Sequence, residues 1–164
     1  MVKKGFPVLF IFLLFISCGY FMSQMDFYEP VQEKMINRDF QGTIQLIKEA
    51  KHKNKYGNKE ILLYYLDLGF AYHYANLYDS SSIFLTLAED KGEELFTKSI
   101  TRAFGSLLLN DNVLEYSGED YELIYTNLFK ALNYLHQGNN EAAFVEIRRS
   151  NLKMELLNQK YGDL

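Results

Sequence analysis

The sequence predicts an all-α protein, and three observations point to this class. Helix-breaking residues are scarce: the 164-residue chain has only two prolines, and Pro7 lies in an apolar N-terminal segment. Leu, Glu, Lys and Ala, which favour helices, recur along the whole chain. Apolar residues recur at helical spacing, and no segment keeps the alternation that a strand requires.

Seven helices are expected, beginning near Pro30, which suits a first turn because its missing N–H costs nothing there. The second helix carries Phe40, Ile44 and Ile47 on one stripe, and the polar segment 53–58 after it indicates a loop. The predicted helices cover residues 30–37, 39–53, 59–75, 78–91, 93–109, 119–136 and 140–161.

The later helices are separated by short polar breaks. Asp79 or Ser80 is available to cap the fourth helix. Polar residues at 110–112 end the fifth, and residues 117–118 break the chain before the sixth. Residues 137–139 join the last two helices, so we expect these two to form an antiparallel hairpin.

The N-terminus has the features of a secretory leader. Lys3 and Lys4 precede an apolar run at 6–16 and the small residue Ser17. Cys18, the only cysteine, follows at the cleavage position, and this arrangement resembles the bacterial lipoprotein signal. The resemblance implies that the first 17 residues are removed and that a lipidated Cys18 anchors the protein to the bacterial cell membrane.

Two other interpretations of this segment stay open. Phe15 stands where the lipoprotein signal usually has Leu, and the apolar stretch 6–22 approaches the length that spans a bilayer. The alternatives are therefore a retained single span or an ordinary cleaved leader. In a Gram-negative cell, Gly19 rather than Asp after the cysteine favours the outer membrane. We expect a tether at 18–27 and one helical domain at 28–164.

Charge and cysteine usage exclude several classes of function. After cleavage, the chain would carry 15 Lys and Arg against 21 Asp and Glu, a net charge of −6 that disfavours binding to nucleic acid. A lipidated Cys18 leaves no thiol for a disulfide within the chain. Stability must then come from packing, for which 13 Tyr and 13 Phe supply large apolar surfaces.

Seven residues in the third and fourth helices have a spacing found in helical repeats: Tyr65, Leu68, Gly69, Tyr72, Ser81, Leu85 and Ala88. This pattern resembles the tetratricopeptide repeat, in which small residues let two antiparallel helices approach closely while large ones fill the surrounding space. The resemblance implies stacked helix pairs that form a short, irregular α-solenoid.

Two weaker copies surround this one. Part of the first recurs in the second helix, at Phe40, Thr43, Ile47 and Ala50. The other lies in the last two helices, at Ala131, Tyr134, Ala143 and Ile147. Lys130 stands where the repeat has Leu, so this last copy is degenerate. An ordinary helical bundle whose packing matches the repeat spacing is the alternative.

A more specific resemblance covers residues 107–151. Asn110-Asp111, Tyr116, Gly118-Glu119, Tyr121-Glu122 and Asn127 are similar to part of an uncharacterised family of bacterial lipoproteins with tetratricopeptide-like helices. The match continues through Ala131-Leu132, Tyr134-Leu135, Gly138, Ala142-Ala143, Val145-Glu146 and Arg148-Arg149. The family has no assigned catalytic residues. Its members extend beyond this point, so a reading frame truncated at Leu164 is a further expectation left open.

Reactive side chains do not form a recognisable catalytic or metal-binding pattern. The three histidines, at 52, 73 and 136, share no metal-ligand spacing, and His73 is expected to pack beside Tyr72. Acidic runs at 89–94 and 115–122 fit solvated faces or helix starts. We therefore expect no catalytic residue, cofactor, metal or small-molecule substrate.

Three charges near the C-terminus are candidates for binding a partner. Glu146 and Arg149 are three residues apart and can pair on one helical face. Arg148 points elsewhere and could hold a partner's carboxylate with two hydrogen bonds. A plain surface ion pair is the alternative to this role.

These observations predict an exported, lipid-anchored scaffold or assembly factor that binds an envelope protein or peptide and performs no catalysis. Two alternatives remain open at this point. One is a cell-envelope enzyme that acts on glycans through an acidic pair drawn from Glu119, Asp120 and Glu122. The other is a truncated gene product with no independent function.

Overall fold

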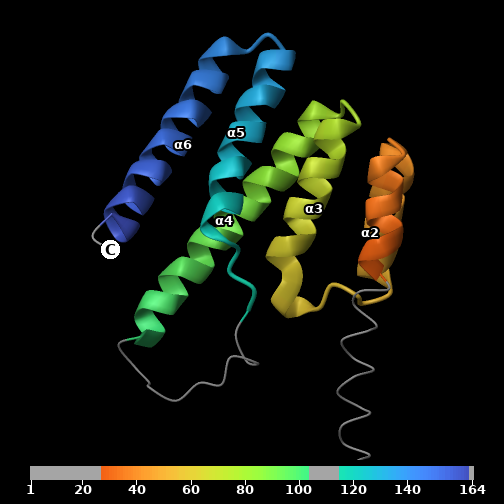
Figure 1. Ribbon diagram of the computed structural model, residues 1–164, viewed down its shortest axis with the longest axis horizontal. Coiled ribbons are helices and arrows are strands. Elements are labelled where there is room, and N and C mark those ends of the chain that lie inside the picture. Colours follow the sequence, from red (N-terminus) through yellow and green to blue (C-terminus); the bar gives the residue numbers. More distant parts are fainter. Residues whose placement is uncertain (1–26, 104–114, 163–164) are drawn as a thin grey trace, which may run out of the picture.

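The protein is described by a computed structural model that covers residues 27–103 and 115–162. Within these ranges every element is helical, which confirms the all-α prediction (Figure 1). The predicted signal peptide 1–17, Cys18 and nearly all of the tether 18–27 lie outside the described residues. None of the described helices is long and apolar enough to cross a membrane.

Antiparallel helices follow one another from one side of the molecule to the other (Figure 1). A helix at 27–36 comes first, then α2 (Phe40–His52), a 3-10 turn η1 (Asn58–Glu60), α3 (Ile61–Tyr74), α4 (Tyr78–Ala103), α5 (Asp120–His136) and α6 (Asn140–Tyr161). The pairs that pack most extensively are α3 with α4 and α5 with α6, while α4 also packs on α5.

Polar side chains fix the beginnings of three helices. Asp39 accepts a hydrogen bond from the N–H of Gly42 at 2.9 Å and so caps α2. Asn139 caps α6 in the same way, accepting from the N–H of Ala142 at 3.1 Å. At the start of α5, the N–H of Glu119 donates to the carboxylate of Glu122 at 2.8 Å.

The contact between α3 and α4 depends on two small residues of the predicted repeat. Gly69 faces Leu85 so closely that an added Cβ would lie 2.6 Å from the Leu85 side chain. The Ser81 hydroxyl donates to the carbonyl oxygen of Gly69 at 2.8 Å, across the same contact. Leu68 and Ala88 are fully buried beside it. These residues therefore allow the two backbones to approach closely.

Two apolar cores lie on either side of α3. The first joins the N-terminal helix, α2 and α3, and consists of Val31, Ile44, Ile47, Ala50, Tyr56, Leu68, Ala71 and Tyr72. The second joins α3 with α4 and consists of Leu62, Leu66, Ala88 and Leu95. Half-buried Tyr64 and Phe84 pack against the first core, and half-buried Tyr65 packs against the second. Aromatic packing thus dominates the first half of the molecule.

The structure corrects two of the predicted helix boundaries. Helices were expected at 78–91 and 93–109, but α4 is continuous through Gly92 to Ala103, and residues 104–114 are outside the described part. One glycine costs a helix only about 1 kcal/mol, which packing can offset. An added Cβ at Gly92 would lie 2.8 Å from Leu123, so this glycine permits the approach of α5. Pro30 is the fourth residue of helix 27–36 and so lies in its first turn, as expected.

The close approach at Gly69 generates a prediction about stability. Gly69→Ala forces Leu85 or the helix backbones to shift, so we expect the free energy of unfolding to fall by about 1–3 kcal/mol. Gly57→Ala is the matched control, because its Cβ would meet its nearest neighbour at 3.6 Å and its φ of −65° suits alanine. Urea unfolding of both variants measures the difference. Equal stabilities would contradict the packing described at Gly69.

Candidate functional site

The helix α5 buries polar residues and exposes apolar ones. Its buried residues are Thr126, Asn127, Lys130, Ala131 and Asn133, of which only the alanine is apolar. Its exposed side includes Tyr121, Tyr125, Leu128 and Leu135, which follow one another at helical spacing on one face. This is the reverse of the usual arrangement for a helix on the surface of a globular protein.

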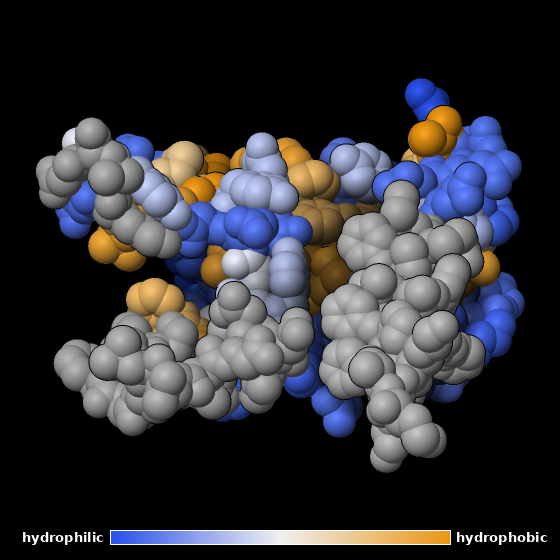
Figure 2. All heavy atoms as spheres, turned by 60° about the horizontal axis from the view of Figure 1, so that its bottom comes forward, coloured by the Kyte–Doolittle hydropathy of each residue, from blue (hydrophilic) through white to orange (hydrophobic). Residues whose placement is uncertain are grey.

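The helix α6 has the same reversed arrangement. Ala143, Glu146 and Ser150 are buried, whereas seven large apolar side chains are exposed: Phe144, Val145, Ile147, Leu152, Met154, Leu156 and Tyr161. We call α5 and α6 together the inverted hairpin. Apolar groups reach the surface on the α4–α6 side of the molecule in Figure 2. The inverted hairpin therefore presents far more apolar surface than isolated exposed residues would give.

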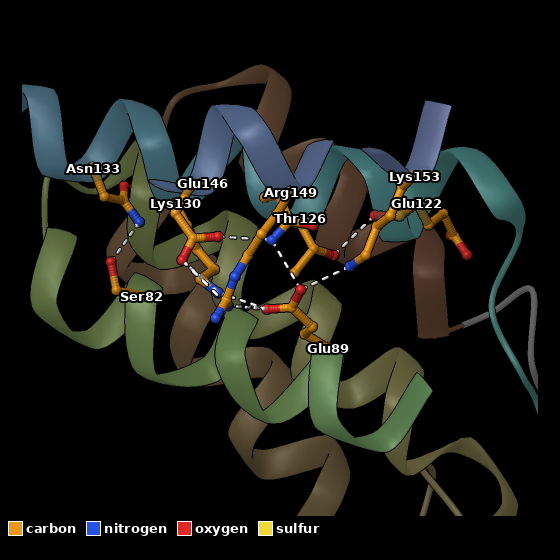
Figure 3. Close-up of polar contacts among 10 residues, drawn as sticks. Ser82, Glu89, Glu122, Thr126, Lys130, Asn133, Glu146, Arg149 and Lys153 are labelled. Atoms are coloured by element: carbon orange, nitrogen blue, oxygen red, sulfur yellow. Dashed lines mark hydrogen bonds and ion pairs between the residues drawn. The ribbon is translucent and has the colours of Figure 1, made fainter. Parts of the chain in front are cut away.

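Two carboxylates and one ammonium group lie buried where α4, α5 and α6 meet (Figure 3). Lys130 Nζ lies 2.7 Å from Glu89 and 3.1 Å from Glu146, and all three side chains are at most 7% exposed. Lys153 Nζ adds a contact with Glu89 at 2.7 Å. Arg149, which is half exposed, approaches both carboxylates at 3.6 and 3.7 Å.

Asn127 completes this group, which we call the buried polar cluster: Glu89, Asn127, Lys130 and Glu146. Its amide nitrogen donates to Glu89 at 2.9 Å and to Glu146 at 2.7 Å. Its amide oxygen has no hydrogen-bond partner within the described part of the chain. Because both neighbouring carboxylates only accept hydrogen bonds, the amide must turn its nitrogen toward them. The unpaired oxygen costs about 1–3 kcal/mol.

Electrostatic complementarity keeps Glu89 ionised. Burial alone would raise the pKa of the Glu89 carboxyl, but hydrogen bonds from Lys130, Lys153 and Asn127 outweigh it and lower this pKa to about 2. The cluster therefore joins α4, α5 and α6 through a fixed charge pattern at neutral pH. Rotating any one of the three helices would leave a buried charge without its partner, which costs about 3–5 kcal/mol.

A second buried network continues along the inner face of α5. The Asn133 amide nitrogen donates to the hydroxyls of Ser81 and Ser82 at 2.8 and 3.1 Å. Its oxygen lies 2.6 Å from Nδ1 of His73, which also packs edge-on against Phe129. His73 is therefore a packed residue held by α5. His136, the last residue of α5, stacks on Tyr78 of α4 with ring centres 4.6 Å apart.

Glu146, Arg148 and Arg149, the predicted partner-binding residues, differ in exposure in the structure. Glu146 is 5% exposed and belongs to the buried polar cluster, which corrects its placement at that surface. Its predicted pairing with Arg149 is present at 3.7 Å. Arg148 is exposed on α6 and makes no hydrogen bond or ion pair with any residue that the structure describes. Arg149 is exposed as well, so Arg148 and Arg149 both lie at the surface where the sequence placed them.

The acidic residues also separate into two groups. Glu89 was grouped with a solvated run, but it is buried, because three donors replace its water. Glu122, at the start of α5, accepts from the hydroxyl of Tyr116 and from the N–H of Glu119. Asp120 accepts from the hydroxyl of Tyr161 at 2.6 Å. Asp120 and Glu122 therefore hold the start of α5 in place.

Residues of the third repeat copy are less uniformly packed than those of the first. Ala131 and Ala143 are buried in the contact between α5 and α6. Tyr134 is half-buried and Ile147 is 37% exposed, whereas the corresponding Tyr72 and Leu85 are buried. Ile147 thus contributes to the outer apolar face of the inverted hairpin rather than to the core.

One further acidic group is buried near the N-terminal helices. Burial raises the pKa of the Asp67 carboxyl to about 6, although a hydrogen bond from the Tyr56 hydroxyl at 2.5 Å opposes this change. Burial and the charge of Asp67 in turn raise the pKa of Tyr56. Tyr56 belongs to the first apolar core, and the Asp67 carboxylate satisfies its buried hydroxyl.

No family model, curated protein or solved structure matches the chain. Within residues 27–103 and 115–162, no three His, Cys, Asp or Glu side chains are grouped so that they could hold a metal ion. The arrangement that distinguishes this molecule is therefore the inverted hairpin, with its buried polar cluster and its exposed apolar face.

The two shifted carboxyl groups predict pH dependences of opposite sign. Glu89 has a lowered pKa in the folded state, so its contribution to stability is present above about pH 4.5 and is lost as the pH falls toward 2. Asp67 has a raised pKa, so its contribution declines as the pH rises from about 4 to about 6. We expect the free energy of unfolding, measured across pH, to lose its decline below about pH 4.5 in Glu89→Gln and its decline between about pH 4 and 6 in Asp67→Asn. An unchanged profile in Glu89→Gln would contradict the buried polar cluster.

The cluster also predicts which substitutions the hairpin tolerates. Lys130→Met leaves two buried carboxylates facing each other, so we expect it to cost about 3–5 kcal/mol of unfolding free energy. Replacing all four members together, as Glu89→Leu, Asn127→Leu, Lys130→Met and Glu146→Leu, removes the buried charges together with the amide that they satisfy and should recover most of that loss. Chemical denaturation of both variants makes the comparison. A quadruple variant no more stable than Lys130→Met would contradict this account.

Proposed function

We propose that the protein is an exported, lipid-anchored helical-repeat module that binds another envelope protein through the outer face of the inverted hairpin. The observation that carries this proposal is the exposure of eleven large apolar side chains on α5 and α6. Helices on the surface of a globular protein usually turn polar residues outward and apolar residues toward the core. This hairpin has the opposite character.

The geometry of the face favours a helical partner. On α5, Tyr121, Tyr125 and Leu128 share one side of the helix, and on α6 Phe144, Ile147 and Met154 do the same. Two antiparallel helices pack side by side here (Figure 1), as α3 and α4 do earlier in the chain. An amphipathic helix laid against the outer face would continue this stacking and bury the apolar stripes.

A charged residue gives the partner a further property. Arg148 is exposed on α6, one turn from Phe144 on one side and one turn from Leu152 on the other. An arginine surrounded by apolar groups favours a carboxylate that makes two hydrogen bonds with it as the interface forms. The proposed partner segment is therefore an amphipathic helix with an Asp or Glu next to its apolar face.

Export and anchoring rest on the sequence of the leader. Lys3, Lys4, the apolar run 6–16 and Ser17 precede Cys18 in the pattern of a lipoprotein signal. A thioether-linked lipid together with an amide-linked acyl chain would anchor the protein stably, since two chains suffice. The helical-repeat assignment is supported by the close approach of Gly69 to Leu85 and by the hydrogen bond from Ser81 to Gly69, because the repeat pattern expects small residues at these positions.

Site-specific crosslinking in cells tests the proposal. A photo-reactive amino acid at Tyr125 or Phe144 should join the protein to one defined envelope partner, and Arg148→Glu should reduce the yield at least about tenfold. Ile36 is the matched control position, because it is also an exposed apolar residue but lies on the N-terminal helix. A partner helix with its acid changed to Lys should restore crosslinking to Arg148→Glu. Equal yields from Ile36 and Phe144, or no effect of Arg148→Glu, would contradict the proposal.

A further inference from the structure

A cluster of lysines interrupts the acidic composition of the chain. Residues 48–59 contain five lysines, at positions 48, 51, 53, 55 and 59, and a single acid, Glu49, although the whole chain has a net charge of −4. The end of α2, the loop that follows it and η1 carry these residues. In Figure 2, which brings this end of the molecule forward, hydrophilic residues gather on the α2 side.

Two of these lysines extend into solvent. Lys53 is 70% exposed and lies 3.6 Å from Glu49, which makes at most a weak surface ion pair. Lys55 is exposed and has no ion-pair partner among the residues that the structure describes. Lys51 is held closer to the protein, because its ammonium group donates to the carbonyl oxygen of Tyr56 at 3.1 Å.

An open hollow of about 250 Å³ lies directly beside them. Its apolar lining comes from Phe27, Pro30, Leu46 and Ala50, and its polar lining comes from Glu49, Lys53 and Lys55. Apolar groups bordered by lysines are the combination that binds at the boundary between lipid headgroups and acyl chains. The hollow is therefore a second feature, independent of charge, that suits a lipid surface.

The position of this surface follows from the connectivity of the chain. The ring of Phe27 packs edge-on against that of Tyr56 at 5.3 Å, so the described chain begins next to the lysine-bearing loop. Cys18 precedes Phe27 by nine residues, which can span at most about 30 Å when fully extended. A lipid on Cys18 would therefore hold this loop near the bilayer. The turn between α5 and α6 lies at the opposite end of the molecule (Figure 1).

We propose that Lys53, Lys55 and the adjoining hollow form a contact surface for anionic phospholipid headgroups. This inference rests on the lipid anchor at Cys18 proposed above, which supplies a high effective concentration of membrane. Each lysine near an anionic leaflet strengthens such a contact roughly fivefold. The contact directs the turn between α5 and α6 away from the membrane and leaves the side of the inverted hairpin open to a partner.

Fluorescence quenching on vesicles tests this surface. The processed, lipidated protein carries a fluorophore at Asn58→Cys, in the loop, or at Asn140→Cys, at the far end of the molecule. It is reconstituted into vesicles of phosphatidylcholine alone or with about one third phosphatidylglycerol, both containing a headgroup-level quencher. We expect stronger quenching at position 58 than at 140 on the anionic vesicles. Salt at about 0.5 M should remove the difference, because the attraction is screened.

Charge reversal supplies the matched control. Lys55→Glu should remove most of the excess quenching at position 58, and Lys53→Glu with Lys55→Glu should remove all of it. Arg148→Glu makes the same change in net charge on α6 and should leave the quenching unchanged. Equal quenching at positions 58 and 140 on anionic vesicles would overturn the proposal, and so would equal effects of Lys55→Glu and Arg148→Glu. Either outcome would indicate that Lys53 and Lys55 bind an acidic protein instead of anionic lipid.

The same vesicles separate this proposal from the lipid anchor. Flotation with neutral vesicles measures membrane attachment through the lipid anchor alone. Comparison with a Cys18→Ser chain shows whether that attachment depends on the Cys18 thiol. Loss of flotation would refute the anchor. The difference in quenching between positions 58 and 140 on anionic vesicles still decides the role of the lysines in that case, because the probes report where the loop lies.

Discussion

The burial of Lys130 between two carboxylates is the constraint on which the rest of this structure depends. A buried ammonium group requires both Glu89 and Glu146 within ion-pair distance, and these come from α4 and α6. Because Lys130 must point toward both carboxylates, the rotation of α5 about its axis is fixed. Because the polar side of α5 then faces inward, Tyr121, Tyr125 and Leu128 must face outward. The exposed apolar face is thus a geometric consequence of the buried charges.

The two halves of the molecule are stabilised by different means. In the first half, aromatic and aliphatic side chains fill the space around a close contact at Gly69, as expected of a helical repeat. In the second half, ion pairs and amide hydrogen bonds join α4, α5 and α6, and most large apolar groups stay outside. A partner that covers those groups would supply the apolar burial that the second half lacks. The lysine-bearing loop lies at the end opposite the turn between α5 and α6, which suits a molecule that contacts a membrane at one end and a partner along its side.

Local sequence patterns predict the helices but not how each is rotated in the fold. The helix starts at Asp39 and Asn139 can be predicted from the sequence, because each capping side chain bonds to a backbone N–H only three residues away. Gly92 was expected to interrupt a helix, and only the proximity of Leu123 explains its place inside α4. The repeat pattern has a buried Leu at the position of Lys130. The lysine was therefore interpreted as a sign of a degenerate repeat copy, and its burial was not predicted. The spacing of Asn127, Lys130 and Asn133 on one face was available in the sequence, but polar residues on one side ordinarily indicate a solvated face.

The reactivity of the Lys130 amine tests the central claim most directly. Native-state labelling of lysines with an amine-reactive reagent, followed by mass spectrometry, ranks each side chain by its access to solvent. A Lys130 that is 2% exposed should react at least a hundredfold more slowly than Lys55, roughly as a buried group does when it reacts only through local unfolding. Labelling of Lys130 at the rate of Lys55 would show that α5 is rotated differently, and the outward apolar face would then have no basis.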